Sequence, residues 1–205
     1  MIGLLRAGIA AALLILASAP AATAAPKRAG VYPGLPRVEI KTEFGPIVIA
    51  LETKRAPITA NNFLRYVDTH KFDGTVFYRA ARGKAHPDKG LIQGGIDTNI
   101  RKSFFPIQHE PTTVTGIKHL DGTVSMARNK PGSAMGDFFI TLGPAPGLDA
   151  DGDYAGYAAF GHVVSGMDVA RRILAMPTYP GGLSLATMGQ TIKQPVKIVS
   201  VKRLP

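Results

Sequence analysis

The sequence contains no cysteine and no tryptophan among its 205 residues. Without cysteine, the chain has no disulfide, no thiolate zinc site, no cysteine nucleophile and no attachment point for the lipid of a lipoprotein. Charged residues are also sparse, at 19%, whereas hydrophobic residues make up 45%. This balance is typical of a folded chain rather than a disordered one. A single domain of this length buries enough surface to fold without a disulfide or a metal.

Acidic residues are scarce relative to basic ones, since 14 Asp and Glu stand against 24 Lys and Arg, for a net charge of +10. Such an excess is common in proteins that bind nucleic acid. The basic residues are dispersed along the chain rather than gathered in a stripe, so we expect no nucleic-acid partner. Attraction to anionic envelope surfaces, or simple solubility, is the alternative use of this charge.

The N-terminus is nearly devoid of charge, because Arg6 is the only charged residue before Lys27. An apolar run over residues 7–17 follows Arg6, and Ala22-Thr23-Ala24 then offers an A-x-A cleavage site. This order is that of a secretory signal peptide. Pro20 and its small neighbours make the segment a poor membrane anchor, so we expect no stable membrane insertion after cleavage.

These features divide the chain into three parts. We predict a cleavable signal peptide over residues 1–24, a flexible linker rich in Pro and Gly over residues 25–37, and a folded domain over residues 38–205. The mature protein is then expected in the periplasm of a bacterium, as a monomer.

The folded part consists mainly of short apolar or alternating runs bounded by Gly, Pro, Asn and Asp, which predict strands. Eight such runs occur: 38–42, 47–52, 76–80, 91–95, 123–128, 138–142, 158–164 and 196–202. Two segments change to helical spacing, 57–69 and 167–175. Because closing a sheet removes its exposed edges, we predict a mainly β fold in which a closed β-barrel is capped by two short α-helices.

The usual catalytic and metal-binding patterns are missing. The sequence has no G-x-S-x-G elbow, no Walker loop and no dinucleotide fingerprint. The five histidines lack metal-binding spacing, and Asp149-Ala150-Asp151-Gly152-Asp153 lacks the glycine and the glutamate of a calcium loop. We therefore expect surface or structural histidines, a polar turn at 149–153, no metal and no cofactor.

Six short motifs remain. They are Ala56-Pro57-x-Thr59-x-x-Asn62-Phe63, Phe77-Tyr78-Arg79, Leu91-Ile92-Gln93-Gly94-Gly95, Ser125-Met126-Ala127-Arg128, Gly136-Asp137-Phe138-Phe139-Ile140 and Phe160-Gly161. In this order and approximate spacing, over residues 38–203, the sequence resembles the cyclophilin family of peptidyl-prolyl cis-trans isomerases. Tyr157–Gly161 followed by Gly166–Val169 is most similar to the bacterial periplasmic members. The resemblance implies a closed eight-stranded antiparallel barrel with two capping helices.

The resemblance also assigns roles to residues. It implies that Arg79 is catalytic and donates a hydrogen bond to the prolyl nitrogen of a twisted X–Pro bond. Proline-containing unfolded or extended polypeptides are the implied partners, and assistance to the folding of exported proteins is the implied role. The residues implied to bind substrate are Phe139 as the floor of a proline pocket, Leu91 and Leu148 as its walls, Gln93, the main chain of Ala127 and Arg128, and also Asp137 and Tyr157.

The sequence departs from the family pattern in several places, and two of the departures, at Gly90 and Asp137, favour an alternative. The spacing between Arg79 and Gln93 is longer than usual, Gly90 stands where an aromatic residue commonly lines the pocket, and Asp137 stands where many members carry Gln. A carboxylate near Arg79 either orients the guanidinium or holds it back, and the sequence leaves both open. The alternative function is a catalytically weak, peptide-binding chaperone or assembly module.

Overall fold

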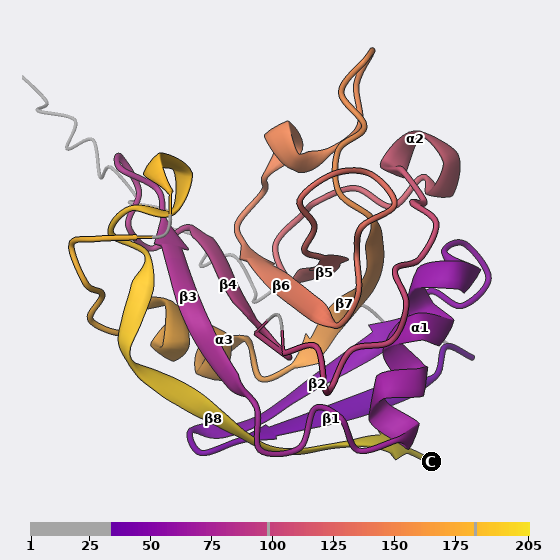
Figure 1. Cartoon of the computed structure of the whole chain (residues 1–205), viewed down its shortest axis with the longest axis horizontal. Coiled ribbons are helices and arrows are strands. Elements are labelled where there is room, and N and C mark those ends of the chain that lie inside the picture. The colour runs from indigo at the N-terminus through magenta and orange to yellow at the C-terminus, as the bar shows by residue number, and fades with distance from the viewer. Residues whose placement is uncertain (1–33, 98, 183) are drawn as a thin grey trace, which may run out of the picture.

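Eight antiparallel strands close into a barrel in the order β1-β2-β7-β5-β6-β4-β3-β8, with β8 pairing to β1 (Figure 1). The computed structural model describes residues 34–205 except residues 98 and 183. The predicted signal peptide and most of the predicted linker lie outside the described residues. The strands are β1 (Arg37–Thr42), β2 (Gly45–Leu51), β3 (Val76–Arg82), β4 (Gly90–Gly95), β5 (Thr123–Met126), β6 (Asp137–Leu142), β7 (Ala159–Ser165) and β8 (Thr191–Leu204).

Two helices of two or more turns pack on this barrel. Helix α1 (Pro57–Asp68) contacts β7 and β8, whereas α3 (Met167–Leu174) contacts β2, β3 and β4, and the two lie on opposite sides of the barrel in Figure 1. The remaining helical segments are single turns: α2 (Thr112–Thr115), η1 (Pro146–Leu148) and η2 (Leu185–Thr187). None of the helices among the described residues is long and apolar enough to cross a membrane.

The core follows from the alternation that the sequence shows. Val38 and Ile40 of β1 and Ile47 and Ile49 of β2 are fully buried, because every second side chain of a strand points into the barrel. Phe63 of α1 closes this core with aromatic contacts, its ring centroid lying 5.3 Å from that of Phe138 and 5.2 Å from that of Phe160. The predicted closed barrel with two capping helices is therefore confirmed.

The eight predicted strands and two predicted helices all form, and the differences lie at their ends. β8 begins at Thr191, five residues before the predicted start, because it also pairs with β3 through Thr191 and Arg79. β3 continues to Arg82, so the first part of the long Arg79–Gln93 spacing extends the β3–β4 hairpin, in which Arg82 pairs with Gly90. β1 begins at Arg37, the residue at which the predicted linker ends.

Helix α1 receives its N-terminal cap from a residue that is distant in sequence. Its own N-cap residue, Ala56, offers no side-chain acceptor. The buried carboxylate of Glu110 instead accepts hydrogen bonds from the Ile58 N–H at 3.1 Å, the Thr59 N–H at 2.7 Å and the Thr59 hydroxyl at 2.6 Å. Because a negative charge at a helix N-terminus also meets the positive end of the helix dipole, Glu110 fixes α1 to the 107–112 segment.

We predict that Glu110→Ala lowers the free energy of unfolding by about 2 kcal/mol, because it leaves buried backbone donors without an acceptor. Urea unfolding followed by circular dichroism measures the change. The matched control is Glu39→Ala, which removes a partly exposed ion pair with Lys202 at 3.5 Å and is expected to cost less than about 1 kcal/mol. Equal losses for the two variants would contradict the capping role.

Candidate active site

A β-bulge in β3 determines where Arg79 points. Phe77 pairs with Gly94 of β4, but Arg79 pairs with the very next residue, Gln93, so Tyr78 is an extra residue on β3. In a regular strand, Phe77 and Arg79 would share a face. The bulge breaks this alternation, and Phe77 is fully buried in the core whereas Arg79 is half-buried on the outer face.

Two glutamines hold the guanidinium of Arg79. Its Nε donates to Oε1 of Gln190 at 2.8 Å, and its Nη1 donates to Oε1 of Gln93 at 2.7 Å. No described residue accepts a hydrogen bond from Nη2, so both N–H groups of this nitrogen are available to a ligand. Burial lowers the pKa of Arg79 from its ordinary value, but an arginine stays protonated in proteins. The site therefore presents a fixed, charged donor.

Asp137 reaches Arg79 only through other side chains. The ion pairs between described residues do not include Asp137 with Arg79. Its Oδ1 accepts hydrogen bonds from the Tyr78 hydroxyl at 3.2 Å and from the Asp97 N–H at 2.8 Å. Tyr78 in turn accepts from Nε2 of Gln93 at 2.7 Å. Among the described residues, hydrogen bonds therefore connect this carboxylate to the guanidinium through Tyr78 and Gln93.

This chain of hydrogen bonds determines which way the Gln93 amide faces. Burial, and secondarily the charge of Asp137, raises the pKa of Tyr78, so its hydroxyl keeps its proton and donates it to the carboxylate. The phenol oxygen then accepts from the amide nitrogen of Gln93, which leaves the amide oxygen toward Arg79. Asp137 thus orients Arg79 through Tyr78 and Gln93.

The predicted floor of the proline pocket lies beside this network. Phe139 of β6 is directly opposite Gln93 of β4, so the two side chains share the outer face of the sheet. Tyr157 meets the Phe139 ring edge-on with centroids 5.4 Å apart. The Arg128 guanidinium lies over the Tyr157 ring at 4.7 Å and donates from Nε to the Gly156 carbonyl at 3.0 Å. Arg128 therefore holds Tyr157 against Phe139.

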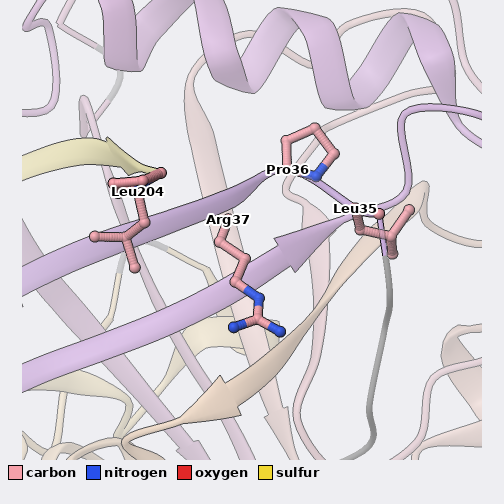
Figure 2. A pocket seen from close by; sticks show the side chains of 6 residues that line it. Leu35, Pro36, Arg37 and Leu204 are labelled. Carbon is pink, nitrogen blue, oxygen red and sulfur yellow. The ribbon is translucent and has the colours of Figure 1, made fainter.

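The two predicted walls, Leu91 and Leu148, meet at a hollow of about 210 Å³. The other residues that line it are Ala81, Gly90, Leu142, Gly143, Pro144 and Ala145. The predicted floor, Phe139, is not among these lining residues, so the structure brings the two walls together but not around Phe139. A larger hollow, of about 430 Å³, is formed where β1 starts and β8 ends, around Leu35, Pro36, Arg37 and Leu204 (Figure 2). It contains none of the predicted site residues, so size alone does not locate the site.

Of the main chain of Ala127 and Arg128, which is predicted to bind substrate, only a part is free of hydrogen bonds to described residues. The Ala127 N–H donates to the carbonyl of Asp137 at 2.9 Å and is therefore not free for a substrate. The Arg128 main chain makes no hydrogen bond with the residues that the structure describes. Of the two predicted backbone contacts, Arg128 is the one whose amide and carbonyl can meet an extended peptide.

Gly90 cannot be replaced by the aromatic residue that the family commonly has here. Its φ is +146°, and a Cβ atom at this position would lie 1.9 Å from the carbonyl oxygen of Ala81. The Gly90 backbone lies this close to Ala81 because Gly90 pairs with Arg82, the last pair of the β3–β4 hairpin before its loop. The missing aromatic wall is therefore a consequence of the hairpin and leaves the pocket open beside Leu91.

The sequence left three residues of this arrangement unidentified. Tyr78 lies within the Phe77-Tyr78-Arg79 motif, but only the bulge brings its hydroxyl to Gln93. Gln190 is far from any motif, and no sequence signal points to it. His119 is a buried histidine stacked on Phe139, with ring centroids 5.9 Å apart.

Known proteins share both the sequence pattern and the fold. The family model described as cyclophilin type peptidyl-prolyl cis-trans isomerase/CLD matches residues 37–203. A peptidyl-prolyl cis-trans isomerase of Acinetobacter baylyi is 40% identical over 169 residues, which cover 80% of this chain and 84% of the relative. Peptidyl-prolyl cis-trans isomerase B of Escherichia coli is 33% identical over 153 residues, or 71% of this chain and 88% of the relative.

A solved structure supports the same fold. The crystal structure of a cyclophilin type peptidyl-prolyl cis-trans isomerase of Cryptosporidium parvum superposes with a TM-score of 0.63 at 21% sequence identity. The superposition covers 83% of this chain and 98% of that structure.

We predict that Gln190→Ala lowers kcat/KM about fivefold toward a peptide containing one X–Pro bond, because Arg79 then loses one of its two fixed acceptors. A coupled proteolytic or NMR exchange assay measures the change. The control is Gln194→Ala, further along β8, which is expected to leave kcat/KM unchanged. An unchanged value for Gln190→Ala would show that Gln93 alone suffices to hold the guanidinium.

Proposed function

Because the chain belongs to the cyclophilin-type peptidyl-prolyl cis-trans isomerases, and so catalyses rotation about X–Pro bonds of polypeptides, we propose that Arg79 is its catalytic residue. The observation that carries this assignment is the fixed guanidinium, whose Nε and Nη1 are held by two glutamines while Nη2 is left for substrate. Phe139, the proposed floor of the proline pocket, lies opposite Gln93 in the β4–β6 pair.

The chemistry requires only a site that favours a twisted amide. Rotation about the C–N bond meets a barrier of about 20 kcal/mol, because resonance gives that bond double-bond character. In the twisted state the prolyl nitrogen becomes pyramidal and regains a lone pair. A hydrogen bond from Nη2 of Arg79 to that lone pair is made only in this state, and a thousandfold acceleration needs about 4 kcal/mol of such preference.

The other site residues hold the substrate while the bond turns. The apolar proline ring lies against Phe139, beside the hollow that Leu91 and Leu148 line. The main-chain amide and carbonyl of Arg128 bind the extended chain on one side of that ring. Tyr157, held by Arg128, limits movement of the Phe139 ring. Holding the ring still converts rotation about the bond into movement of the preceding carbonyl alone.

The alternative function, a weakly active peptide-binding chaperone, rests on one remaining observation. Gly90 leaves the proline pocket without an aromatic wall, which favours loose binding over precise positioning. Asp137 no longer supports it, because its carboxylate is engaged by Tyr78 and Asp97 and orients Arg79 through Gln93. We therefore place catalysis first.

We predict that the intact mature protein accelerates cis/trans exchange of an X–Pro peptide in NMR exchange spectra, and that Arg79→Ala reduces kcat/KM about 100-fold. Loss of the hydrogen bond proposed from Arg79 to the prolyl nitrogen causes the decrease. Arg79→Lys is expected to restore little, because an ammonium lacks the planar fork that both glutamines hold.

The same experiment separates the two functions. No acceleration by the intact protein at stoichiometric concentration would overturn the assignment of Arg79 and leave the chaperone alternative. Equal acceleration by the intact protein and Arg79→Ala would exclude Arg79 alone. Suppressed aggregation of a client without proline by both proteins would support a chaperone activity that is independent of the arginine.

We further propose that residues 1–24 are a signal peptide and that the mature enzyme assists the folding of exported proteins in the periplasm. The support is the order of Arg6, the apolar run and Ala22-Thr23-Ala24, together with a mechanism that uses no cysteine and so does not depend on the redox state of the compartment. The excess of basic residues suits an enzyme that works beside anionic envelope surfaces.

Mass spectrometry of the periplasmic fraction of a bacterium that expresses the full chain tests the export proposal. We predict a mature protein that begins at Ala25. Ala24→Lys is expected to block cleavage, because the site needs a small residue there, whereas Thr23→Ala is expected to be cleaved normally. Full-length protein in the cytoplasm for all three would contradict the proposal.

A further inference from the structure

A buried hydrogen-bonded array of three side chains lies behind the candidate site. His119 is buried, with 1% of the residue exposed, and both nitrogens of its ring take part in hydrogen bonds. Nδ1 lies 2.7 Å from Oδ1 of Asp149, and Nε2 lies 3.0 Å from Oγ of Ser125. A buried polar side chain satisfied at every atom has one allowed orientation, so the plane of this ring is fixed.

The charge state of the ring follows from its partners. A carboxylate only accepts hydrogen bonds, so Nδ1 carries the proton. Burial lowers the pKa of His119 below its ordinary value, although Asp149 acts in the opposite direction. The ring is therefore neutral near pH 7, and Nε2 accepts the hydroxyl proton of Ser125.

This fixed ring is the surface against which Phe139 rests. The two rings lie nearly parallel, with centroids 5.9 Å apart and planes inclined by 14°. Tyr157 meets Phe139 from a second direction, at 87°. Phe139 is thus confined between a stacked ring and an edge-on ring, and only the stacked one is held by buried hydrogen bonds.

His119 also fixes the wall of the pocket that carries Leu148. Its N–H donates to Oδ1 of Asp149 at 3.0 Å, and its carbonyl accepts from the Ala145 N–H at 2.9 Å. These two bonds attach both ends of the 145–149 segment to one residue. The proposed floor, Phe139, and the wall residue Leu148 therefore share His119 as a support.

We propose that His119 is a positioning residue for proline binding, which sets the plane of Phe139 and the place of Leu148 through the array with Asp149 and Ser125. The inference rests on the proposed function of the pocket. His119 does not touch substrate, so its loss changes how firmly the proline ring is held rather than the hydrogen bond from Arg79.

The test is His119→Asn, which keeps a short donor toward Asp149 but removes the ring stacked on Phe139. We expect KM for an X–Pro peptide to rise about fivefold, the factor that corresponds to about 1 kcal/mol of aromatic contact, with kcat changed less than about twofold. The NMR signals of the Phe139 ring are expected to shift or broaden. Ser125→Ala, which frees only one ring nitrogen, is expected to act in the same direction with a smaller effect.

The matched control is His162→Asn. His162 is a partly buried histidine paired with a carboxylate, since its Nε2 lies 3.2 Å from Oε1 of Glu52. It lies on β7, where it pairs with Thr123 rather than with a residue next to Phe139. This variant is expected to lose stability while leaving KM and the Phe139 signals unchanged.

The outcomes distinguish this inference from the proposed function. An active intact protein whose KM and Phe139 signals are unchanged in His119→Asn would overturn the positioning role alone. Equal changes in KM for His119→Asn and His162→Asn would show that the rise in KM comes from a general loss of stability, and would also overturn the positioning role of His119. If His119→Asn does not fold, Ser125→Ala tests the positioning role instead, through KM and the NMR signals of the Phe139 ring. An inactive intact protein would overturn the proposed function instead.

Discussion

The extra residue in β3 reverses the side-chain alternation of that strand and so turns Arg79 out of the core while Phe77 stays in it. The rest of the site is arranged around this reversal. Gln93 is the direct partner of Arg79 across the β3–β4 pair and of Phe139 across the β4–β6 pair. One register thus places the charged donor, the amide that holds it and the apolar floor on neighbouring strands of a rigid barrel, as precise positioning requires.

The same bulge explains why a carboxylate is compatible with the site. Because Tyr78 occupies the bulge, its hydroxyl lies between Asp137 and Gln93. The carboxylate therefore orients the Gln93 amide through this hydroxyl, without itself contacting the amide. Tyr78 and Asp137 therefore act as a pair: a phenol without the carboxylate would leave the amide of Gln93 free to turn, and a carboxylate without the phenol would be buried near the guanidinium. Polar networks of this kind are worthwhile only when every member is satisfied.

The sequence predicted the barrel from local patterns, and the resemblance of its motifs to a known family predicted most residues of the candidate site. Alternation located all eight strands, and helical spacing after Pro57 located α1. The motifs located Arg79, Gln93 and Phe139, which the structure brings together. Contacts between distant segments left no such trace: Gln190 reaches Arg79 from the start of β8, Glu110 caps α1 across the chain, and the hydrogen-bonding of Tyr78 depends on a one-residue shift in register. The clash at Gly90 likewise exists only once Ala81 is in place.

The seam between β1 and β8 has a consequence for how the molecule is made. Arg37 pairs with Leu204, so the first and last strands of the barrel are neighbours, and β8 also supplies the partner for β3. A chain still emerging from a ribosome therefore lacks the strand that joins its two edges until β8 (Thr191–Leu204) appears. Contacts of such long sequence separation slow folding. The enzyme that turns X–Pro bonds in other polypeptides thus closes its own barrel only with β8, and the edges of β1 and β3 stay unpaired until that strand is in place.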